Sequence, residues 1–487
     1  MITFGSGLVR ARAVRTDVRE RPIRGRFPHR SLADAFRALL FLPAVLVGCG
    51  PKIPCGPAGA TQADAPVVIV TVPSEDGSTV VVEALVAAGS AYDPPGAEGL
   101  AALTAQSVAS GADADRPPLE VQIGREWVSF TRICPAAEAR ACVDRFATAL
   151  ADPPFAEQAV SASRDRALEE LTEGLPTDAG ALGQVLVDDA LYEGRPYGHP
   201  VQGRAGVLPL LDAAATRRFY EIHYTREGMI AGLAGAWDAG LHDALQQDLQ
   251  PLVPRPAAGL VLPAPPPLRG RDLLVVDTGG PDAAFAVAAP LDVGRDDADW
   301  PALDLATQTF SARTQAGGHL LQSLRAARGL RDDVNASIEP GALPRRQHAL
   351  ELWITPAPAG SRPGVLKQAL DQLGSFAGDG VSAEELDANR AWLLGRLAEE
   401  ARDPRQRLAR ALEAEATGTP DLLDYLPKVL PGLTAAQMNT ALHKHVDLAN
   451  LVIVATGPDA AGLADRLAGE DLDLARTTVL PAQGLLR

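Results

Sequence analysis

Lysine and long apolar runs are scarce in this 487-residue sequence. Only four of its 45 basic residues are lysines, and 61 acidic residues outnumber them all, for a formal charge of −16. A protein that binds the nucleic-acid backbone needs a basic surface, so this charge argues against a nucleic-acid partner. With 46% apolar and 22% charged residues, the composition is that of a globular protein rather than a disordered one. The length predicts two large domains or about three smaller ones.

The first 48 residues have the composition of an export signal. Nine arginines against three acidic residues give residues 1–37 a charge of +6, and the uncharged apolar run Ala38–Gly48 follows. Eleven residues are too few for a membrane-spanning helix, which needs about 20. The sequence Leu46-Val47-Gly48-Cys49 resembles the bacterial lipoprotein signal, in which the cysteine is lipidated and becomes the first residue. The alternative is a buried core helix that ends in a cysteine.

The lipoprotein interpretation predicts a protein of the bacterial cell envelope that meets the membrane only through a lipid on Cys49. Gly50, rather than Asp, follows this cysteine, which resembles the pattern that permits sorting to the outer membrane, facing the periplasm. Besides Cys55, the other cysteines are Cys134 and Cys142, which are eight residues apart. An oxidising compartment would allow this pair to form a disulfide. The alternative is two small buried residues, since Cys142, Phe146 and Leu150 share a helical face.

Two parts of the sequence share one order of predicted elements. Each has two apolar strands rich in β-branched residues, an acidic turn, a long helix and, much later, a last strand before a glycine. The corresponding ranges are 67–72 and 273–276 for the first strand, 79–86 and 283–289 for the second, 99 and 300 for the start of the helix, and 229–233 and 451–455 for the last strand. The repeat predicts two similar α+β domains.

A proline-rich stretch separates the two parts. Residues 251–270 include Pro265-Pro266-Pro267, which cannot continue a helix or a central strand. We therefore predict a lipoprotein signal at 1–48, a tether at 49–65, an N-terminal domain at 66–250, a linker at 251–270 and a C-terminal domain at 271–487.

Three motifs resemble the pitrilysin/insulinase/mitochondrial processing peptidase family of inverted zinc peptidases. The resemblance covers about Pro66 to the C-terminus and implies an α+β fold of two homologous domains, each an antiparallel sheet with helices packed on one side. The motifs are the helix and its lead-in at Gly89–Leu103, the segment Pro196-Tyr197-Gly198-His199-Pro200-Val201-x-Gly203, and the segment from Gly318 to Arg328-Gly329-Leu330.

The zinc-binding motif of that family is missing. In the family, His-x-x-Glu-His on this helix places two histidines on one face to hold Zn²⁺, and the glutamate acts as general base on the zinc-bound water. Here Ala102 and Gln106 occupy the histidine positions, and Ala105 occupies the glutamate position. The resemblance therefore implies a degenerate site with no catalytic residue and no zinc. Glu170 is the nearest match to the third ligand, and we expect it to be a solvated helix residue.

Other polar residues leave their roles open. Arg328 matches a family arginine that helps to hold the substrate, but Asp332 replaces the tyrosine that accompanies it. Arg328 either holds a peptide carbonyl or pairs with Asp332 or Asp333 as a structural cap. The pair in His443-Lys444-His445 could chelate a metal weakly, but we expect two solvated surface residues.

The resemblance and the missing motif together predict a non-catalytic envelope lipoprotein. It would be the zinc-less subunit that completes the peptide-binding chamber of an active partner, a homologue that carries His-x-x-Glu-His. A peptide or unfolded polypeptide would be the substrate, and the charge of −22 beyond the leader predicts a preference for basic peptides. One alternative is a stand-alone peptide- or protein-binding envelope lipoprotein without a proteolytic role. The second is an active metalloendopeptidase with an unrecognised site.

Overall fold

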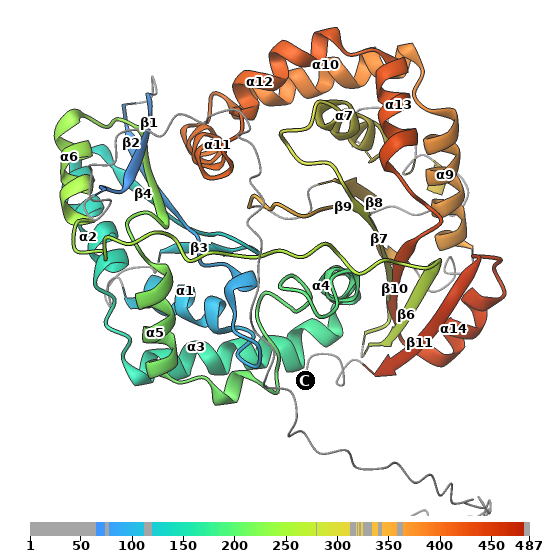
Figure 1. Ribbon diagram of the computed structural model, residues 1–487, viewed down its shortest axis with the longest axis horizontal. Coiled ribbons are helices and arrows are strands. Elements are labelled where there is room, and N and C mark those ends of the chain that lie inside the picture. The colour runs from blue at the N-terminus through green and yellow to red at the C-terminus, as the bar shows by residue number, and fades with distance from the viewer. Residues whose placement is uncertain are drawn as a thin grey trace, which may run out of the picture. The chain divides into compact units, whose positions relative to one another are not determined.

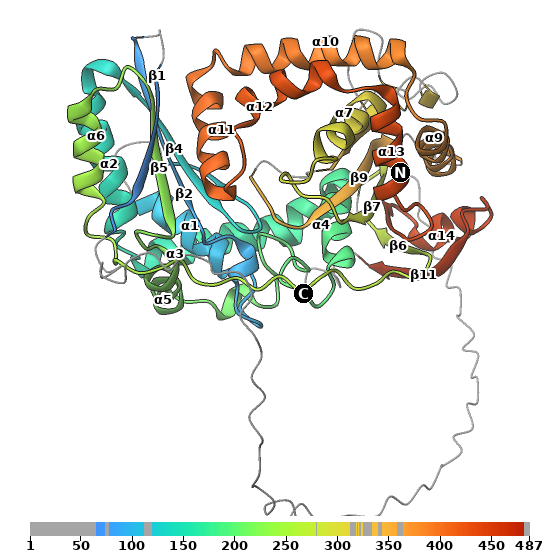
Figure 2. The same cartoon turned by 45° about the horizontal axis from the view of Figure 1, so that its top comes forward.

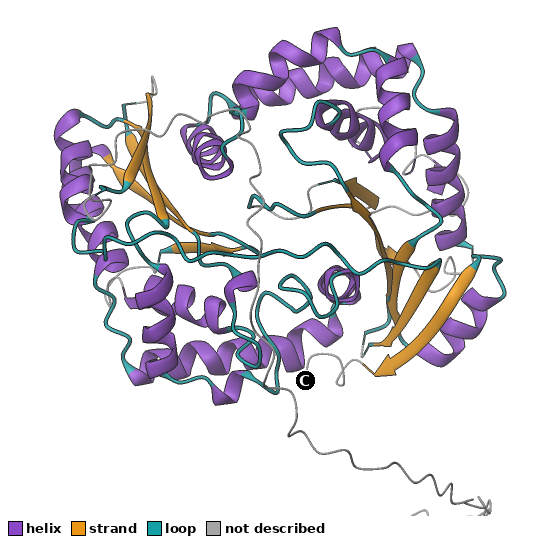
Figure 3. Ribbon diagram, in the orientation of Figure 1, coloured by secondary structure: helices purple, strands orange, loops and turns teal. Residues whose placement is uncertain are grey.

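The protein is built on two β-sheets, each covered by helices (Figure 1, Figure 3). The computed structural model describes residues 65–73, 77–111, 119–278, 280–311, 318, 320, 323–324, 334–338, 343–357 and 364–481. All of these lie in the single unit formed by residues 61–487. The predicted signal sequence, Cys49 and Arg328 lie outside the described residues.

The first half of the chain forms a five-stranded sheet in the order β1-β5-β2-β4-β3. Three of its helices begin at side-chain caps: Asp178, Asp212 and Asp238 each accept a hydrogen bond from a backbone amide in the first turn of the helix that follows. The elements are β1 (Val68–Pro73), β2 (Thr79–Val86), α1 (Leu100–Gly111), β3 (Glu120–Ile123), β4 (Val128–Pro135), α2 (Ala139–Ala151), α3 (Glu157–Glu169), α4 (Ala179–Leu191), α5 (Ala213–His223), β5 (Met229–Gly235) and α6 (Ala239–Asp248).

The second half forms a six-stranded sheet in the order β11-β6-β10-β7-β9-β8. Two of its helices start with a capping box, at Ser382 with Glu385 and at Thr434 with Gln437. The elements are β6 (Arg271–Asp277), β7 (Ala283–Leu291), α7 (Trp300–Ser311), β8 (Val334–Ser337), β9 (His348–Ala357), α9 (Val365–Asp379), α10 (Ala383–Glu400), α11 (Pro404–Thr417), α12 (Leu422–Val429), α13 (Ala435–His445), β10 (Leu451–Gly457), α14 (Ala460–Ala468) and β11 (Leu474–Pro481).

The two sheets repeat one topology. If the edge strand β11 is set aside, β6-β10-β7-β9-β8 follows the same order as β1-β5-β2-β4-β3. The helices α1 and α7 occupy the same place in chain order after the second strand of each half. The α+β class and the paired sheets predicted from the sequence repeat are thus confirmed.

The sheets are mixed rather than antiparallel throughout, which corrects one detail of the expected fold. Strand β1 runs parallel to β5, and β6 runs parallel to both β10 and β11, while the other neighbours are antiparallel. The parallel pairs arise because the first and last strands of each half run the same way, with long helical connections between them.

The helices also depart from the expected single layer, because each half places one helix on the other half's sheet. Helix α4 packs on β7, β9 and β10 of the second sheet, and α11 packs on β1, β2 and β5 of the first (Figures 1 and 2). A small apolar cluster with Leu408 and Leu412 joins α11 to Val81 and Leu85 of β2. These two helices hold the halves together through buried apolar surface.

The proline-rich connection between the halves contains no regular structure, since residues 254–270 form neither helix nor strand. Among the described residues, no helix is long and apolar enough to cross a membrane.

Candidate functional site

The lead-in to α1 is fixed by backbone hydrogen bonds and one buried carboxylate. Both oxygens of Asp93 accept backbone N–H groups at the start of α1, from Gly99 and Ala101, each at 2.7 Å. Asp93 thereby caps the helix from six residues upstream. Burial raises the pKa of the Asp93 carboxyl to about 8, although these two hydrogen bonds oppose the rise. His199 Nε2 lies 3.9 Å from Asp93 Oδ2, and burial lowers the pKa of this histidine.

The Pro-Tyr-Gly segment packs directly against this lead-in. Gly99 and Gly203 both have positive φ, at 101° and 93°. A Cβ atom on Gly203 would lie 2.4 Å from the Glu98 carbonyl oxygen and 2.5 Å from the Cα of Gly99, so the two backbones leave no room for a side chain. The segment singled out in the sequence therefore supports the start of α1.

The positions that match the zinc motif are filled by apolar packing. Ala102 is 3% exposed and Ala105 is fully buried, and Ala105 belongs to the main apolar core of the first half. Gln106 is partly buried on the same helix. The structure brings these three positions onto one stretch of α1, as predicted, but none carries a group that could activate water.

Glu170 lies in an exposed turn of π-helix, Glu170–Gly174, that follows α3. Its carboxylate lies over Gly174, with oxygens 3.0–3.1 Å from where a Cβ on that glycine would be. No group of three or more histidine, cysteine, aspartate or glutamate side chains among the described residues could hold a metal ion. The residues present near α1 therefore do not fit zinc.

A buried charge network, which no motif in the sequence indicates, joins the two halves. Asp188 on α4 accepts hydrogen bonds from Arg125 of the β3–β4 turn at 2.9 Å and from Arg345, just before β9, at 3.3 Å. The side chains of the two arginines are 9% and 5% exposed. Burial alone would raise the pKa of Asp188, but Arg345 and Arg125 hold it below its ordinary value. Burial, with Asp188 nearby, raises the pKa of Glu351 on β9 well above its ordinary value.

A second set of contacts extends this network. The Tyr197 hydroxyl of the Pro-Tyr-Gly segment donates to Glu126 Oε1 at 2.5 Å, and the Arg346 backbone N–H donates to the same oxygen at 2.6 Å. The Arg346 guanidinium also pairs with Glu126 at 2.5 Å. Of these residues only Tyr197 could be singled out from the sequence, because it belongs to a motif. Glu126 and Arg346 are more than 200 residues apart in the chain and share no local pattern.

Cys134 at the end of β4 and Cys142 in α2 are joined in a disulfide, with a Cα–Cα distance of 5.9 Å. Both cysteines are also buried. The disulfide and the burial, which the sequence analysis offered as alternatives, therefore occur together in this pair.

Removing this disulfide is expected to lower the free energy of unfolding by about 2 kcal/mol, because a short closed loop restricts the unfolded chain. The measurement is the urea midpoint of the Cys134→Ser/Cys142→Ser variant against the parent, with Cys55→Ser controlling for the loss of a thiol. Equal midpoints for the variant and the parent would show that the bond contributes nothing.

The expectation that His443 and His445 form a solvated surface pair is wrong for His445. Its side chain is 3% exposed, with Nδ1 2.7 Å from Asp292 and Nε2 2.9 Å from Asp299. Lys444 also pairs with Asp299, at 2.7 Å. Burial by itself lowers the pKa of His445, but the two carboxylates outweigh it and the net direction is upward. The histidine thus ties α13 to the start of α7 instead of serving as a metal ligand.

This arrangement predicts a pH-dependent contribution to stability. Because the pKa of His445 is raised in the folded state, the ion pairs stabilise the protein fully below the unfolded pKa of about 6.5 and are lost as pH rises through the folded value. The difference in unfolding free energy between the parent and His445→Gln should therefore shrink from pH 6 to pH 9. His443→Gln is the matched control, since His443 faces the Gly378 carbonyl; a flat difference for His445→Gln would refute this assignment.

Comparisons with known proteins agree with a peptidase-like fold that lacks the zinc motif. Residues 211–393 match the family model described as the peptidase M16 inactive domain, which runs from the first half into the second. A search of curated proteins gave no match to the chain. The match to this family model and the shared fold fit a pitrilysin-family (M16) protein that lacks the catalytic motif, as the sequence motifs predicted.

Several solved structures share the fold of this protein over about four fifths of its chain. A peptidase M16 inactive domain from Pseudomonas fluorescens has a TM-score of 0.71 at 20% identity, over 80% of this chain and 95% of that one. A protease from Helicobacter pylori has a TM-score of 0.71 at 13% identity, over 81% and 98%. The periplasmic protease PqqL from Escherichia coli has a TM-score of 0.61 at 16% identity, over 82% of this chain but only 48% of its own. At these identities the likeness concerns the fold alone.

Proposed function

We propose that this protein is the zinc-less subunit of a two-part peptidase, completing a peptide-binding chamber whose partner carries His-x-x-Glu-His. The partner supplies zinc and the general base, and this chain supplies chamber walls and substrate contacts. The substrate is a peptide or unfolded polypeptide. The chain itself binds no zinc and is anchored through a lipid on Cys49 to the outer membrane, facing the periplasm.

One observation carries this proposal: the scaffold around the former site is intact, whereas the general-base position has become part of the core. Asp93 still caps α1, and the glycines of the Pro-Tyr-Gly segment still pack on its start. Ala105 is fully buried in an apolar cluster. A chain that keeps the architecture but fills the catalytic position with a methyl group is suited to binding and assembly rather than hydrolysis.

The length of one structural relative supports a two-part assembly. This chain covers 48% of the periplasmic protease PqqL, so that protein is about twice as long as the unit described for this chain. A separate partner could supply here what the remaining half supplies there. The Cys134–Cys142 disulfide is compatible with the oxidising periplasm, where such bonds persist.

The test is a pull-down of the tagged full-length protein from envelope extracts, followed by mass spectrometry and a peptidase assay. We expect a His-x-x-Glu-His homologue to co-purify and the recovered complex to cleave peptides until zinc is chelated. Cys49→Ala controls for anchoring and should move the protein from the membrane fraction to the soluble one. Recovery of no such homologue would favour the stand-alone binding protein, and peptidase activity of this chain alone would overturn both non-catalytic readings of the site.

A further inference from the structure

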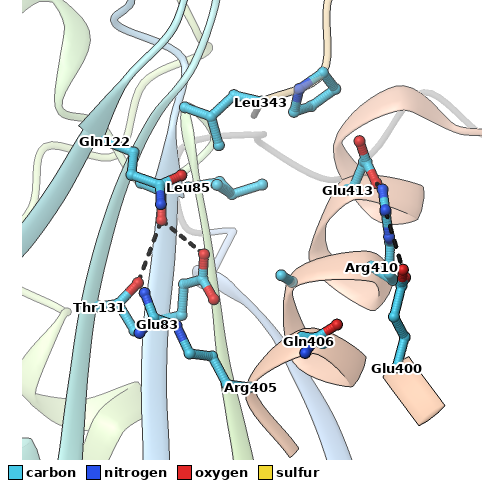
Figure 4. Close-up of a pocket in the computed structure, with 13 residues that line it drawn as sticks. Glu83, Leu85, Gln122, Thr131, Leu343, Glu400, Arg405, Gln406, Arg410 and Glu413 are labelled. Atoms are coloured by element: carbon cyan, nitrogen blue, oxygen red, sulfur yellow. Dashed lines mark hydrogen bonds and ion pairs between the residues drawn. The ribbon is translucent and has the colours of Figure 1, made fainter. Parts of the chain in front are cut away.

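A cavity of about 270 Å³ lies between the first sheet and the helix that the second half places on it (Figure 4). Strands β2, β3 and β4 form one wall, and α11 with the last residue of α10 forms the other. It lies apart from the degenerate zinc positions, none of which lines it. Its volume is below the range of about 300–1,000 Å³ typical of drug-sized ligands, so it suits one side chain or a small molecule.

The wall formed by β2 carries a glutamate at a position where the apolar face of the strand predicts an apolar residue. Residues 81, 83 and 85 point to the same face of the sheet. Val81 and Leu85 belong to the apolar cluster that packs on α11, but Glu83 lies between them and is only 5% exposed. Burying a carboxylate is costly unless it gains a partner, so this residue is hard to explain by folding alone.

Glu83 has only one strong hydrogen bond among the described residues. Ser129 Oγ donates to its Oε1 at 2.6 Å, and Thr131 Oγ1 lies 3.4 Å from the same serine hydroxyl. No hydrogen bond from a described residue reaches Glu83 Oε2, which faces the cavity (Figure 4). Burial raises the pKa of Glu83, and the Ser129 hydrogen bond opposes that rise.

The two guanidinium groups that line the cavity already have carboxylate partners. Arg405 on α11 pairs with Glu120 on β3, and Arg410 pairs with Glu413 at 2.9 Å. Glu83 forms no ion pair with any described residue. The cavity therefore presents one buried carboxylate whose nearby cation, Arg405, lowers its pKa from a distance but forms its ion pair with Glu120.

We propose that this cavity binds an alkylguanidinium or alkylammonium group, with Glu83 as its counter-ion. The cation would donate to Oε2 of Glu83 and to the hydroxyl of Thr131, and its alkyl stem would lie against Leu85 and Leu343, which also line the cavity. Such a cation is either a basic side chain of a peptide or a free small amine. The assignment rests on the chain's own residues and does not depend on a peptidase partner.

The test measures binding to the purified full-length protein by isothermal titration calorimetry. The probes are N-acetyl-arginine amide for a peptide side chain, agmatine for a free amine, and N-acetyl-citrulline amide as the uncharged isostere. We expect at least one cationic probe to bind about tenfold or more tightly than the citrulline probe, as charge-assisted hydrogen bonds allow. Preference for the arginine probe identifies a peptide side chain as ligand, and preference for agmatine identifies a free amine.

The decisive variant is Glu83→Gln, which keeps an oxygen to accept the Ser129 hydrogen bond while removing the charge. It should weaken the cationic probe about tenfold and leave the citrulline probe unchanged. Glu384→Gln, an exposed change of the same net charge in the first turn of α10, is the matched control and should bind as the parent does. Circular dichroism confirms that both variants fold.

The pH dependence of binding distinguishes an ion pair with Glu83 from a fit of the probe by shape alone. The affinity of the cationic probe should increase as pH rises through the raised pKa of Glu83, because only the carboxylate pairs with the cation. The charged groups nearest Glu83 are Arg405 and Glu120, which pair with each other. Across the cavity, Arg410 pairs with Glu400 and Glu413. Because these groups already have partners, Glu83→Gln should abolish the dependence. Equal binding of citrulline and arginine probes, no binding of either cation, or parent-like binding by a folded Glu83→Gln protein would overturn the proposal.

Discussion

Replacing Asp188 by alanine is expected to lower the free energy of unfolding by about 3–5 kcal/mol, because the change leaves two buried guanidinium groups without their shared carboxylate. Arg125 and Arg345 approach Asp188 from opposite halves of the chain, and both are almost fully buried. An uncompensated buried charge costs far more than an exposed ion pair contributes. The measurement is urea unfolding followed by tryptophan fluorescence.

Asp189→Ala is the matched control, one residue further along α4. Asp189 pairs with Arg204, whose side chain is 25% exposed and can turn to water, so the loss should be within about 1 kcal/mol. If Asp188→Ala were no more destabilising than Asp189→Ala, the network would not be what holds α4 and the segment before β9 together.

Introducing glutamate at position 105 is expected to destabilise the protein by more than about 3 kcal/mol. Ala105 is fully buried in the apolar core, so a larger side chain must displace its neighbours and a carboxylate must lose its hydration. Rebuilding the whole motif, with Ala102→His, Ala105→Glu and Gln106→His, should for the same reason fail to yield a folded protein with stoichiometric zinc. Thermal unfolding and metal analysis of the purified variants provide the measurements.

Ser110→Glu is the control for this experiment, since Ser110 is exposed on the same helix and the added charge is identical. It should change the unfolding free energy by about 0.5 kcal/mol or less. A stable triple variant that binds one zinc ion would mean that the former catalytic position is an open cavity and not part of the core.

The elements of regular structure were largely predictable because they depend on local pattern. The apolar β-branched runs became β1, β2, β5, β6, β7 and β10, and both predicted helices after the acidic turns begin within a residue or two of the expected place. The direction of the strands was harder to predict, because an apolar run has the same composition whether it pairs parallel or antiparallel. The parallel pairing of β1 with β5 could therefore not be predicted from the sequence.

The degenerate zinc positions were equally visible in the sequence, since the spacing of the motif on a helix fixes where each residue must be. What surrounds them was not visible. The Arg125–Asp188–Arg345 network and the Glu83 cavity are assembled from strands and helices distant in sequence, and no local periodicity records such contacts. His445 was misjudged for the same reason, because its carboxylate partners Asp292 and Asp299 lie about 150 residues earlier.

This chain has the fold of M16 peptidases, but apolar or amide side chains stand at the positions of the zinc motif. The most direct test is the zinc content and peptidase activity of the purified full-length protein, measured by itself after incubation with zinc and dialysis. We expect far less than one zinc ion per chain and no cleavage of peptides, including basic ones. One tightly bound zinc ion per chain, with peptide cleavage that a chelator abolishes, would contradict this expectation.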